Sequence, residues 1–182
     1  MTSKLHPRKA VFLDRDGTLM RDVGYCSDPA QVELLEGVTE FLPVLKNAGF
    51  SLVIVTNQSG IGRGYFRESD FWSVQNELNR RIGPDLIDAT YFCPELPEST
   101  SERRKPKPGM ILEAARDLGL DLSRSFMVGD KLSDVQAGLS AGLKSSILLE
   151  PDPPTGALFL GASLIAKTFA EVAEFILSTS DQ

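Results

Sequence analysis

Two aspartates follow a short apolar run near the start of the chain. The run Ala10–Leu13 reads AVFL, and Asp14 and Asp16 come directly after it, ahead of Gly17. Carboxylates two residues apart can converge on one divalent cation, and magnesium prefers a few oxygen ligands and commonly bridges to phosphate. An aspartate can also attack phosphorus and form an aspartyl-phosphate, while a second one donates and accepts protons. The alternative is that both acids only form a turn, since Asp-Gly pairs are frequent in turns.

A second polar set lies at the end of the apolar run SLVIV. The segment Thr56–Gly64 reads TNQSGIGRG and combines a hydroxyl, amides and glycines. Backbone N–H groups in such a loop can approach an anion closely. The segment matches neither the phosphate loop of nucleoside triphosphatases nor the dinucleotide fingerprint, which argues against ATP and NAD.

Two more sets follow toward the C-terminus. Arg104–Met110 reads RKPKPGM and opens a predicted helix, where a lysine and the helix dipole favour phosphate; the alternative is a solvated basic loop. Val128–Asp134 reads VGDKLSD, in which Asp130 can complete a magnesium site and Asp134 can orient it. The alternative there is an acid pair at a helix N-terminus. Four such sets, each beside a strand end, are hard to explain independently.

The elements that position these sets alternate between apolar runs and amphipathic stretches. Strands are predicted at Ala10–Leu13, Ser51–Thr56, Ala89–Cys93, Ser125–Val128, Ser145–Leu149 and Leu164–Ala166. Helices are predicted around Val38–Ala48, Glu68–Ile82, Gly109–Leu118, Asp134–Ala141 and Phe169–Leu177. This alternation predicts an α/β fold with one Rossmann-like, doubly wound parallel sheet. Ligands bind beyond the carboxyl ends of the central strands of such sheets, which is where the acids fall.

Length, composition and charge limit the possibilities further. A chain of 182 residues with 42% apolar content predicts one domain over residues 1–182, with a core at about 9–150 and a C-terminal strand and helix at about 160–178. The net charge of −6 argues against nucleic-acid and anionic-membrane partners. Two cysteines are too few for a disulfide framework, and no window is long and apolar enough to span a membrane. We expect a cytoplasmic monomer.

Taken together, DRDGT, TNQSG, RKPKPGM and VGDKLSD resemble the motifs of the haloacid-dehalogenase (HAD) superfamily of aspartate-nucleophile phosphatases. Within it, residues from about Ala10 to about Leu149 resemble the lineage of D-glycero-D-manno-heptose 1,7-bisphosphate phosphatases and histidinol-phosphate phosphatases. The resemblance implies a magnesium-dependent phosphomonoester hydrolase that acts through an aspartyl-phosphate. The stretches between motifs are too short for a separate cap domain, so only a flap is expected between Gly17 and Val38.

The resemblance also implies roles for individual residues. Asp14 is the expected nucleophile, and Asp16 the expected acid and base, which also lends its backbone carbonyl to magnesium. Thr56 and Lys105 would stabilise the phosphoryl group. The expected metal ligands are Asp14, Asp16 and Asp130, supported by Asp134. The expected substrate contacts are Asp22, Val23, Gly24, Tyr25, Asn57, Gln58, Ser59, Arg104 and Lys131, with Tyr25 in a flap that covers the substrate.

The chain departs from this lineage where many relatives carry a zinc loop of the form CPHxP followed by CxC. Here Cys93–Pro97 reads CPELP, and the residues before Arg104 lack cysteine. We therefore expect no zinc, and we expect Cys93 to be a small core residue. Without metal ligands, Glu95–Arg103 is expected to make few contacts and to be mobile until phosphate binds.

The substrate remains a choice among related possibilities. The leading hypothesis is removal of the 7-phosphate from heptose 1,7-bisphosphate, and histidinol phosphatase is the alternative from the same lineage. A polynucleotide 3′-phosphatase has similar motifs, but the acidic balance and the absence of a basic stripe with interleaved aromatic residues disfavour it. A non-catalytic phosphosugar-binding domain is disfavoured by the intact acids.

Overall fold

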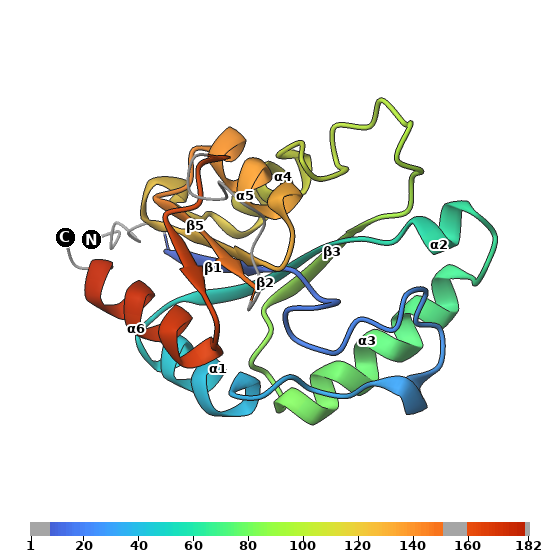
Figure 1. The fold of residues 1–182 in the computed structure, drawn as a ribbon, viewed down its shortest axis with the longest axis horizontal. Coiled ribbons are helices and arrows are strands. Elements are labelled where there is room, and N and C mark those ends of the chain that lie inside the picture. The colour runs from blue at the N-terminus through green and yellow to red at the C-terminus, as the bar shows by residue number, and fades with distance from the viewer. Residues whose placement is uncertain (1–7, 151–159, 181–182) are drawn as a thin grey trace, which may run out of the picture.

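Six parallel strands form one sheet in the computed structural model, which describes residues 8–150 and 160–180 (Figure 1). The strands are β1 (Ala10–Leu13), β2 (Ser51–Asn57), β3 (Ala89–Cys93), β4 (Phe126–Gly129), β5 (Ser145–Leu149) and β6 (Leu164–Ala166). Their order across the sheet is β3-β2-β1-β4-β5-β6, and every neighbouring pair is parallel. The doubly wound sheet predicted from the sequence is confirmed.

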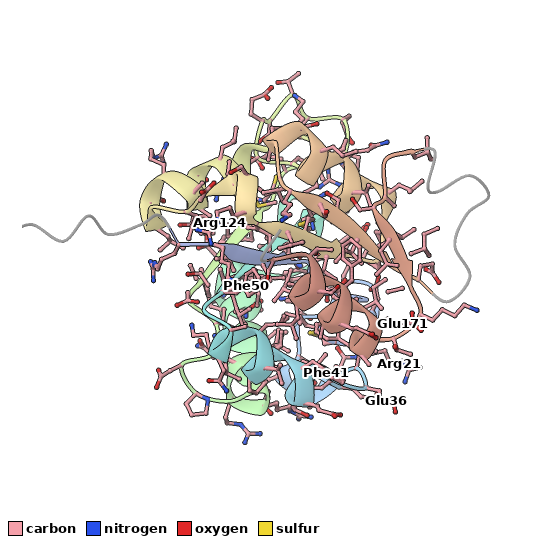
Figure 2. All side chains as sticks on the ribbon, turned by 90° about the vertical axis from the view of Figure 1, so that its left-hand side faces the viewer. Arg21, Glu36, Phe41, Phe50, Arg124 and Glu171 are labelled. Atoms are coloured by element: carbon pink, nitrogen blue, oxygen red, sulfur yellow. The ribbon has the colours of Figure 1, made fainter. Side chains whose placement is uncertain are left out.

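Helices cover both faces of this sheet. They are α1 (Val38–Asn47), α2 (Ser59–Gly62), α3 (Glu68–Ile82), α4 (Gly109–Leu118), α5 (Leu132–Ala141) and α6 (Phe169–Thr179), with 3-10 turns at Pro29–Gln31 and Leu122–Arg124. Helices α4 and α5 lie on one face, and α1, α3 and α6 lie on the other (Figure 1). Figure 2 shows α1 and α6 side by side, with Phe41 labelled on α1.

Alternating strand residues feed two apolar cores, because successive side chains of a strand point to opposite faces. Val11 and Leu13 of β1 pack against the α1, α3 and α6 side, whereas Ala10 and Phe12 pack against α4 and α5. All four are fully buried. Fully burying one large aliphatic or aromatic side chain contributes about 1.5–3 kcal/mol, so a strand buried on both faces is a stable platform for whatever follows it.

The sheet reverses its direction of growth at β1. The chain runs from β1 outward through β2 to β3, and then returns to place β4 on the other side of β1. Such a switch point opens a crevice beyond the carboxyl ends of the two central strands. The residues after β1 and β4 therefore meet there, and the Asp14 N–H donates to the Val128 carbonyl at 2.9 Å.

One predicted segment differs from expectation. Thr56–Gly64 is not a single loop, because Thr56 and Asn57 complete β2 and Ser59–Gly62 form the short helix α2. The Arg63 N–H closes this helical turn on the Ser59 carbonyl at 2.9 Å. The other predicted elements are confirmed to within two residues at their ends.

No cap domain interrupts the described part of the chain. Between β1 and α1 there is only the 3-10 turn Pro29–Gln31, and isolated bridges join Asp16 to Met20 and Met20 to Leu34. Within residues 8–150 and 160–180, no helix has the length and apolar character needed to cross a membrane.

Candidate active site

Lys105 lies at the centre of the crevice although it belongs to the segment before α4. Its ammonium group donates to Asp14 Oδ1 at 2.8 Å and to the Val55 carbonyl at 2.7 Å, and it forms an ion pair with Asp134 Oδ1 at 2.6 Å. Two hydrogen bonds and an ion pair thus hold the ammonium group, and the residue is only 4% exposed. Burial lowers the pKa of Lys105, but Asp134 and Asp14 outweigh it and hold the pKa above its usual value. A fixed, fully charged cation therefore lies at the end of β2.

Asp14 is buried directly after β1, with 6% of its surface exposed. Burial alone would raise its pKa, but the neighbouring Lys105 ammonium outweighs burial and lowers the pKa below its usual value. Asp14 is therefore ionised near neutral pH, as a carboxylate nucleophile must be.

Three carboxylates meet beside Lys105. One oxygen from each of Asp14, Asp130 and Asp134 lies within 4.8 Å of the others. Burial, followed by repulsion from Asp14, raises the pKa of Asp130 to about 7. The buried Asp130 Oδ1 has no hydrogen-bond partner. Crowded acids with an unpartnered oxygen suit a hard divalent cation, so these residues fit magnesium. Asp134 is itself a member of this cluster, whereas the sequence predicted a supporting position for it behind the metal ligands.

Gly17 makes the approach of Asp130 possible. Its φ is +86°, a conformation that favours glycine, and a Cβ at this position would overlap the Asp130 carboxylate. The turn after β1 is therefore also a part of the site. Asp14 and Asp16 can form a turn and still take part in the chemistry, so the two alternatives raised by the sequence are compatible.

The side chain of Asp16 is not part of the three-carboxylate cluster. Arg15 Nε donates to Asp16 Oδ2 at 3.0 Å, Arg15 Nη2 donates to Oδ1 at 3.1 Å, and Gln58 Nε2 donates to Oδ2 at 2.8 Å. Gln58 also donates to Thr56 Oγ1 at 3.0 Å. Burial raises the pKa of Asp16 above its usual value in spite of Arg15. Asp14 and Asp16 thus have pKa values displaced in opposite directions, which suits a nucleophile and a proton donor.

Two predicted substrate contacts, Asn57 and Gln58, bond to other residues of the site. Asn57 donates through Nδ2 to the Lys105 carbonyl at 3.0 Å and accepts from the Lys105 N–H at 3.1 Å. Gln58 is 5% exposed and bonds to Asp16, Thr56 and Arg15. Both line small cavities, but their side-chain amides are largely committed to protein partners.

Most of the predicted site residues line two small adjoining cavities. The first, about 60 Å³, lies over Asp14 and Lys105 and is lined by Asp14, Asp16, Thr56, Asn57, Lys105, Lys131, Ser133 and Asp134. The second, about 80 Å³, is lined by Asp16, Asp22, Gly24, Tyr25, Asn57, Gln58, Ser59, Gly60 and Lys131. Asp16 is shared, so it lies where the phosphoryl end of a substrate would meet the rest of the molecule.

The second cavity is the outer of the two, and its exposed rim is formed by Asp22, Gly24, Tyr25 and Lys131. Tyr25 is 49% exposed, and its ring packs edge-on against Tyr65 with 4.7 Å between centroids. Lys131 contacts Asp22 at 3.3 Å and Asp130 at 3.4 Å. Its pKa is raised because these carboxylates and Asp14 outweigh burial, which acts in the opposite direction.

Two predicted substrate contacts lie outside both cavities. Val23 is 40% exposed in the flap, and the Arg104 guanidinium donates to the Glu95 carbonyl at 2.8 Å.

Comparisons with known proteins agree with this geometry. The HAD-hydrolase-like family model matches residues 102–150. D-glycero-beta-D-manno-heptose-1,7-bisphosphate 7-phosphatase from Helicobacter pylori strain J99 is 44% identical over 148 residues, which cover 80% of this chain and 85% of that protein. D-glycero-alpha-D-manno-heptose-1,7-bisphosphate 7-phosphatase from Burkholderia mallei is 39% identical over 177 residues, which cover 92% and 93%. The chain belongs to the heptose-bisphosphate phosphatase family of HAD-like hydrolases.

A solved member of this family has the same fold. The D,D-heptose 1,7-bisphosphate phosphatase from B. bronchiseptica, solved with magnesium and phosphate, superposes with a TM-score of 0.82 at 30% identity. The alignment covers 93% of this chain and 98% of that one. Phosphatase activity and the HAD fold expected from the four motifs are therefore confirmed.

The segment that replaces the family's zinc loop contradicts one expectation. Glu95–Arg103 was expected to make few contacts, yet Lys107 donates to the Thr100 carbonyl at 2.7 Å, and the Gly109 N–H donates to the Glu102 carbonyl at 2.8 Å. The segment also contains internal bonds: the Ser101 N–H donates to Ser99 Oγ at 3.0 Å, and the Arg103 N–H donates to Ser101 Oγ at 3.3 Å. Mobility of the segment without phosphate stays a prediction.

Cys93 is a core residue, as expected. It is fully buried at the end of β3 and belongs to the same apolar core as Ala10 and Val55. Burial, followed by the hydrogen bond to Glu95, raises the pKa of its thiol to about 11. In the described ranges, the only group of acids, cysteines or histidines placed to hold a metal is the three-aspartate cluster.

Sequence reasoning missed Arg15. A charged residue between two acids looks solvent-exposed, yet Arg15 is 0% exposed. Two features could have indicated its burial. Arg15 lies on a turn that follows a fully buried strand, and Gln58, at the end of the neighbouring strand, can bond to the same aspartate, Asp16.

Proposed function

We propose that this chain removes the 7-phosphate from D-glycero-D-manno-heptose 1,7-bisphosphate through an aspartyl-phosphate on Asp14. The observation that carries the proposal is the pairing of an ionised Asp14, held by Lys105, with an Asp16 whose pKa is raised. The names of relatives at 39–44% identity support the substrate.

Magnesium would be held by Asp14, Asp130 and the backbone carbonyl of Asp16, with Asp134 beside them. When bound, it neutralises phosphate oxygens and orients the phosphoryl group for in-line attack. Lys105 would contribute a second positive charge to the same oxygens, and Thr56 a hydroxyl. We propose no zinc requirement.

In the first step, a carboxylate oxygen of Asp14 forms a bond to phosphorus while the bond from phosphorus to the sugar oxygen breaks. Asp16 gives its proton to that oxygen, so the sugar leaves as an alcohol. The raised pKa of Asp16 favours the protonated form that this step needs.

In the second step, a water oxygen attacks the phosphorus of the aspartyl-phosphate. Asp16, now ionised, takes a proton from that water, and the bond between phosphorus and Asp14 breaks. Inorganic phosphate leaves, and both aspartates return to their starting states.

The rim would select the sugar. We propose that Asp22, Gly24, Tyr25 and Lys131 contact the part of the substrate beyond the phosphoryl group, because they line the outer cavity that Asp16 shares. We also propose one phosphatase domain over residues 1–182 that acts as a cytoplasmic monomer and binds no nucleic acid.

A phosphate-release panel with magnesium tests the substrate. It compares both anomers of heptose 1,7-bisphosphate, fructose bisphosphate, histidinol phosphate and a 3′-phosphorylated oligonucleotide, with Asp14→Asn as the blank. Both anomers are needed because the relatives' names include both. The proposal expects the highest kcat/KM for a heptose bisphosphate; a higher value for histidinol phosphate or the oligonucleotide would overturn it.

A further inference from the structure

Arg15 carries a charge but is fully buried. The residue is 0% exposed, and its guanidinium lies over the ring of Phe71 in α3, 5.1 Å from the ring centroid. Burying a charge is costly unless it is paired, so its partners indicate its purpose. Its side-chain hydrogen bonds go to Asp16 and Gln58.

The contacts leave Asp16 little freedom. A carboxylate offers about four lone-pair sites, two on each oxygen. Oδ2 accepts from Arg15 Nε at 3.0 Å and from Gln58 Nε2 at 2.8 Å, whereas Oδ1 accepts only from Arg15 Nη2 at 3.1 Å. Rotation of the carboxyl group would break these bonds. One site on Oδ1 therefore remains for a proton that moves to or from the substrate.

Gln58 is fixed in the same network. Its Oε1 accepts from Arg15 Nη2 at 3.2 Å, so its Nε2 must point to Asp16 and Thr56. The amide is thereby oriented as a donor to Asp16 Oδ2, and Arg15 controls both sides of the carboxylate.

We propose that Arg15 is a positioning residue: its two-pronged grip, extended by Gln58, fixes Asp16 so that Oδ1 exchanges the catalytic proton. The inference rests on the acid–base role proposed for Asp16. It explains why an arginine, with a planar fork of donors, occupies the position between the two acids, since lysine offers a single point of charge.

Leaving-group dependence separates this role from a merely structural one. An alkyl phosphate must receive a proton as its alcohol leaves, whereas 2,4-dinitrophenyl phosphate releases a stable phenolate that needs none. The parameter kcat/KM covers the steps up to departure of the leaving group, so it reports the first proton transfer alone. Mispositioning of Asp16 should lower kcat/KM for the alkyl ester only.

The experiment measures kcat/KM for both esters in Arg15→Met, Arg15→Lys, Asp16→Asn and the double variant, with the best alkyl phosphate of the substrate panel. General acid–base catalysis contributes about 10²–10⁴-fold. We expect Arg15→Met to lose about 100-fold on the alkyl ester and less than about threefold on the aryl ester. Arg15→Lys, which keeps the charge without the fork, should lose about tenfold with the same selectivity. Arg15→Met should add almost nothing to Asp16→Asn.

A matched control exists on α4. Arg116 donates through Nε to the next residue, Asp117, at 3.1 Å, but its side chain is 74% exposed. Arg116→Met should change neither ester.

The outcomes are distinct. Equal losses on both esters in the Arg15 variants, or a loss below about fivefold on the alkyl ester, would overturn the inference while a selective Asp16→Asn leaves the acid role standing. If Asp16→Asn itself shows no selectivity, the acid role and the inference both fall. If Arg15→Met does not fold, Arg15→Lys alone decides, because its activity on the aryl ester reports an intact site.

Discussion

Lys105 and Lys131 carry the same charge at the same crevice, but the protein surrounds them in different ways. The Lys105 side chain is 3% exposed and contacts two carboxylates at 2.6–2.8 Å, whereas that of Lys131 is 55% exposed and contacts two at 3.3–3.4 Å. A charge fixed before the substrate arrives needs no rearrangement during the reaction. A charge on an exposed rim gains little from its own ion pairs and can rearrange to meet the substrate. We therefore expect the buried residues around Asp14 and Lys105, the floor of the site, to carry the chemistry, and the exposed rim around Lys131 to select the substrate.

The largest effect is expected from Asp14→Asn. The change is nearly isosteric and removes the nucleophile, for which the site has no substitute, so turnover should fall by about 10⁴-fold or more. Phosphate release measures it, and Asp117→Asn on the exposed pair with Arg116 is the control. Activity within tenfold of the parent protein would be incompatible with a nucleophilic Asp14.

Removal of magnesium should abolish activity, and Asp130→Ala should raise the magnesium concentration needed for half-maximal rate. The reason is that Asp14, Asp130 and Asp134 place three acids within 4.8 Å, with one Asp130 oxygen unpartnered. Full activity in a metal-stripped sample would contradict this.

Magnesium should also change stability in a pH-dependent way. The pKa of Asp130 in the folded, metal-free protein is about 7, above its ordinary 3.8, because burial and Asp14 disfavour its ionised form. The contribution of Asp130 to the stability of the metal-free protein is therefore lost as pH rises from about 4 to about 7. Magnesium needs the ionised form, so it should raise the melting temperature more at about pH 8 than at about pH 5.5. An equal increase at both values would contradict this account.

A matched pair of lysine variants tests directly whether the floor and the rim of the site have different roles. Lys105→Met should lower kcat by about 100-fold or more and destabilise the fold, because it leaves buried Asp14 and Asp134 without their cation. Lys131→Met should act mainly on KM, by about tenfold or less. Steady-state kinetics with thermal melts distinguish the two. Similar kinetic effects in both variants would remove the distinction.

Asn57→Ala tests whether the Asn57 amide, which lines the cavity, binds the substrate or holds Lys105 in place. Asn57 makes two hydrogen bonds to the Lys105 backbone, so we expect a loss of about 1–3 kcal/mol of unfolding free energy and a lower kcat. A higher KM with unchanged stability and kcat would assign Asn57 to the substrate instead.

The smallest effect concerns zinc. Purified protein should contain no stoichiometric zinc, and Cys93→Ser should change stability by about 1 kcal/mol, through packing and the hydrogen bond to Glu95 and not through loss of a metal. Elemental analysis checks this, and about one zinc per chain would contradict it.

The sequence was most informative where chemistry follows from topology. Asp14 and Asp130 were predictable together because each follows an apolar run, and parallel strands end at one edge of a sheet. Lys105 was predictable from its motif, but not its burial between Asp14 and Asp134, which depends on the path of the segment before α4.

Amides and the buried arginine show the limit of such reasoning. Asn57 and Gln58 have donors and acceptors that suit a ligand or a neighbour equally, and only distances to Lys105 and Asp16 decide between them. Arg15 is buried against Phe71, a residue from α3 that nothing near Arg15 in the sequence announces.

The most direct test of the account is rapid-quench kinetics of Asp16→Asn with labelled 2,4-dinitrophenyl phosphate and magnesium. This ester needs no acid to leave, whereas hydrolysis of the aspartyl-phosphate needs Asp16 as a base, so the intermediate should accumulate. We predict a burst of about one phenolate per enzyme, with the labelled phosphoryl group on the peptide that contains Asp14. No burst, or label on any other residue, would contradict the claim that the buried floor of this site acts through Asp14.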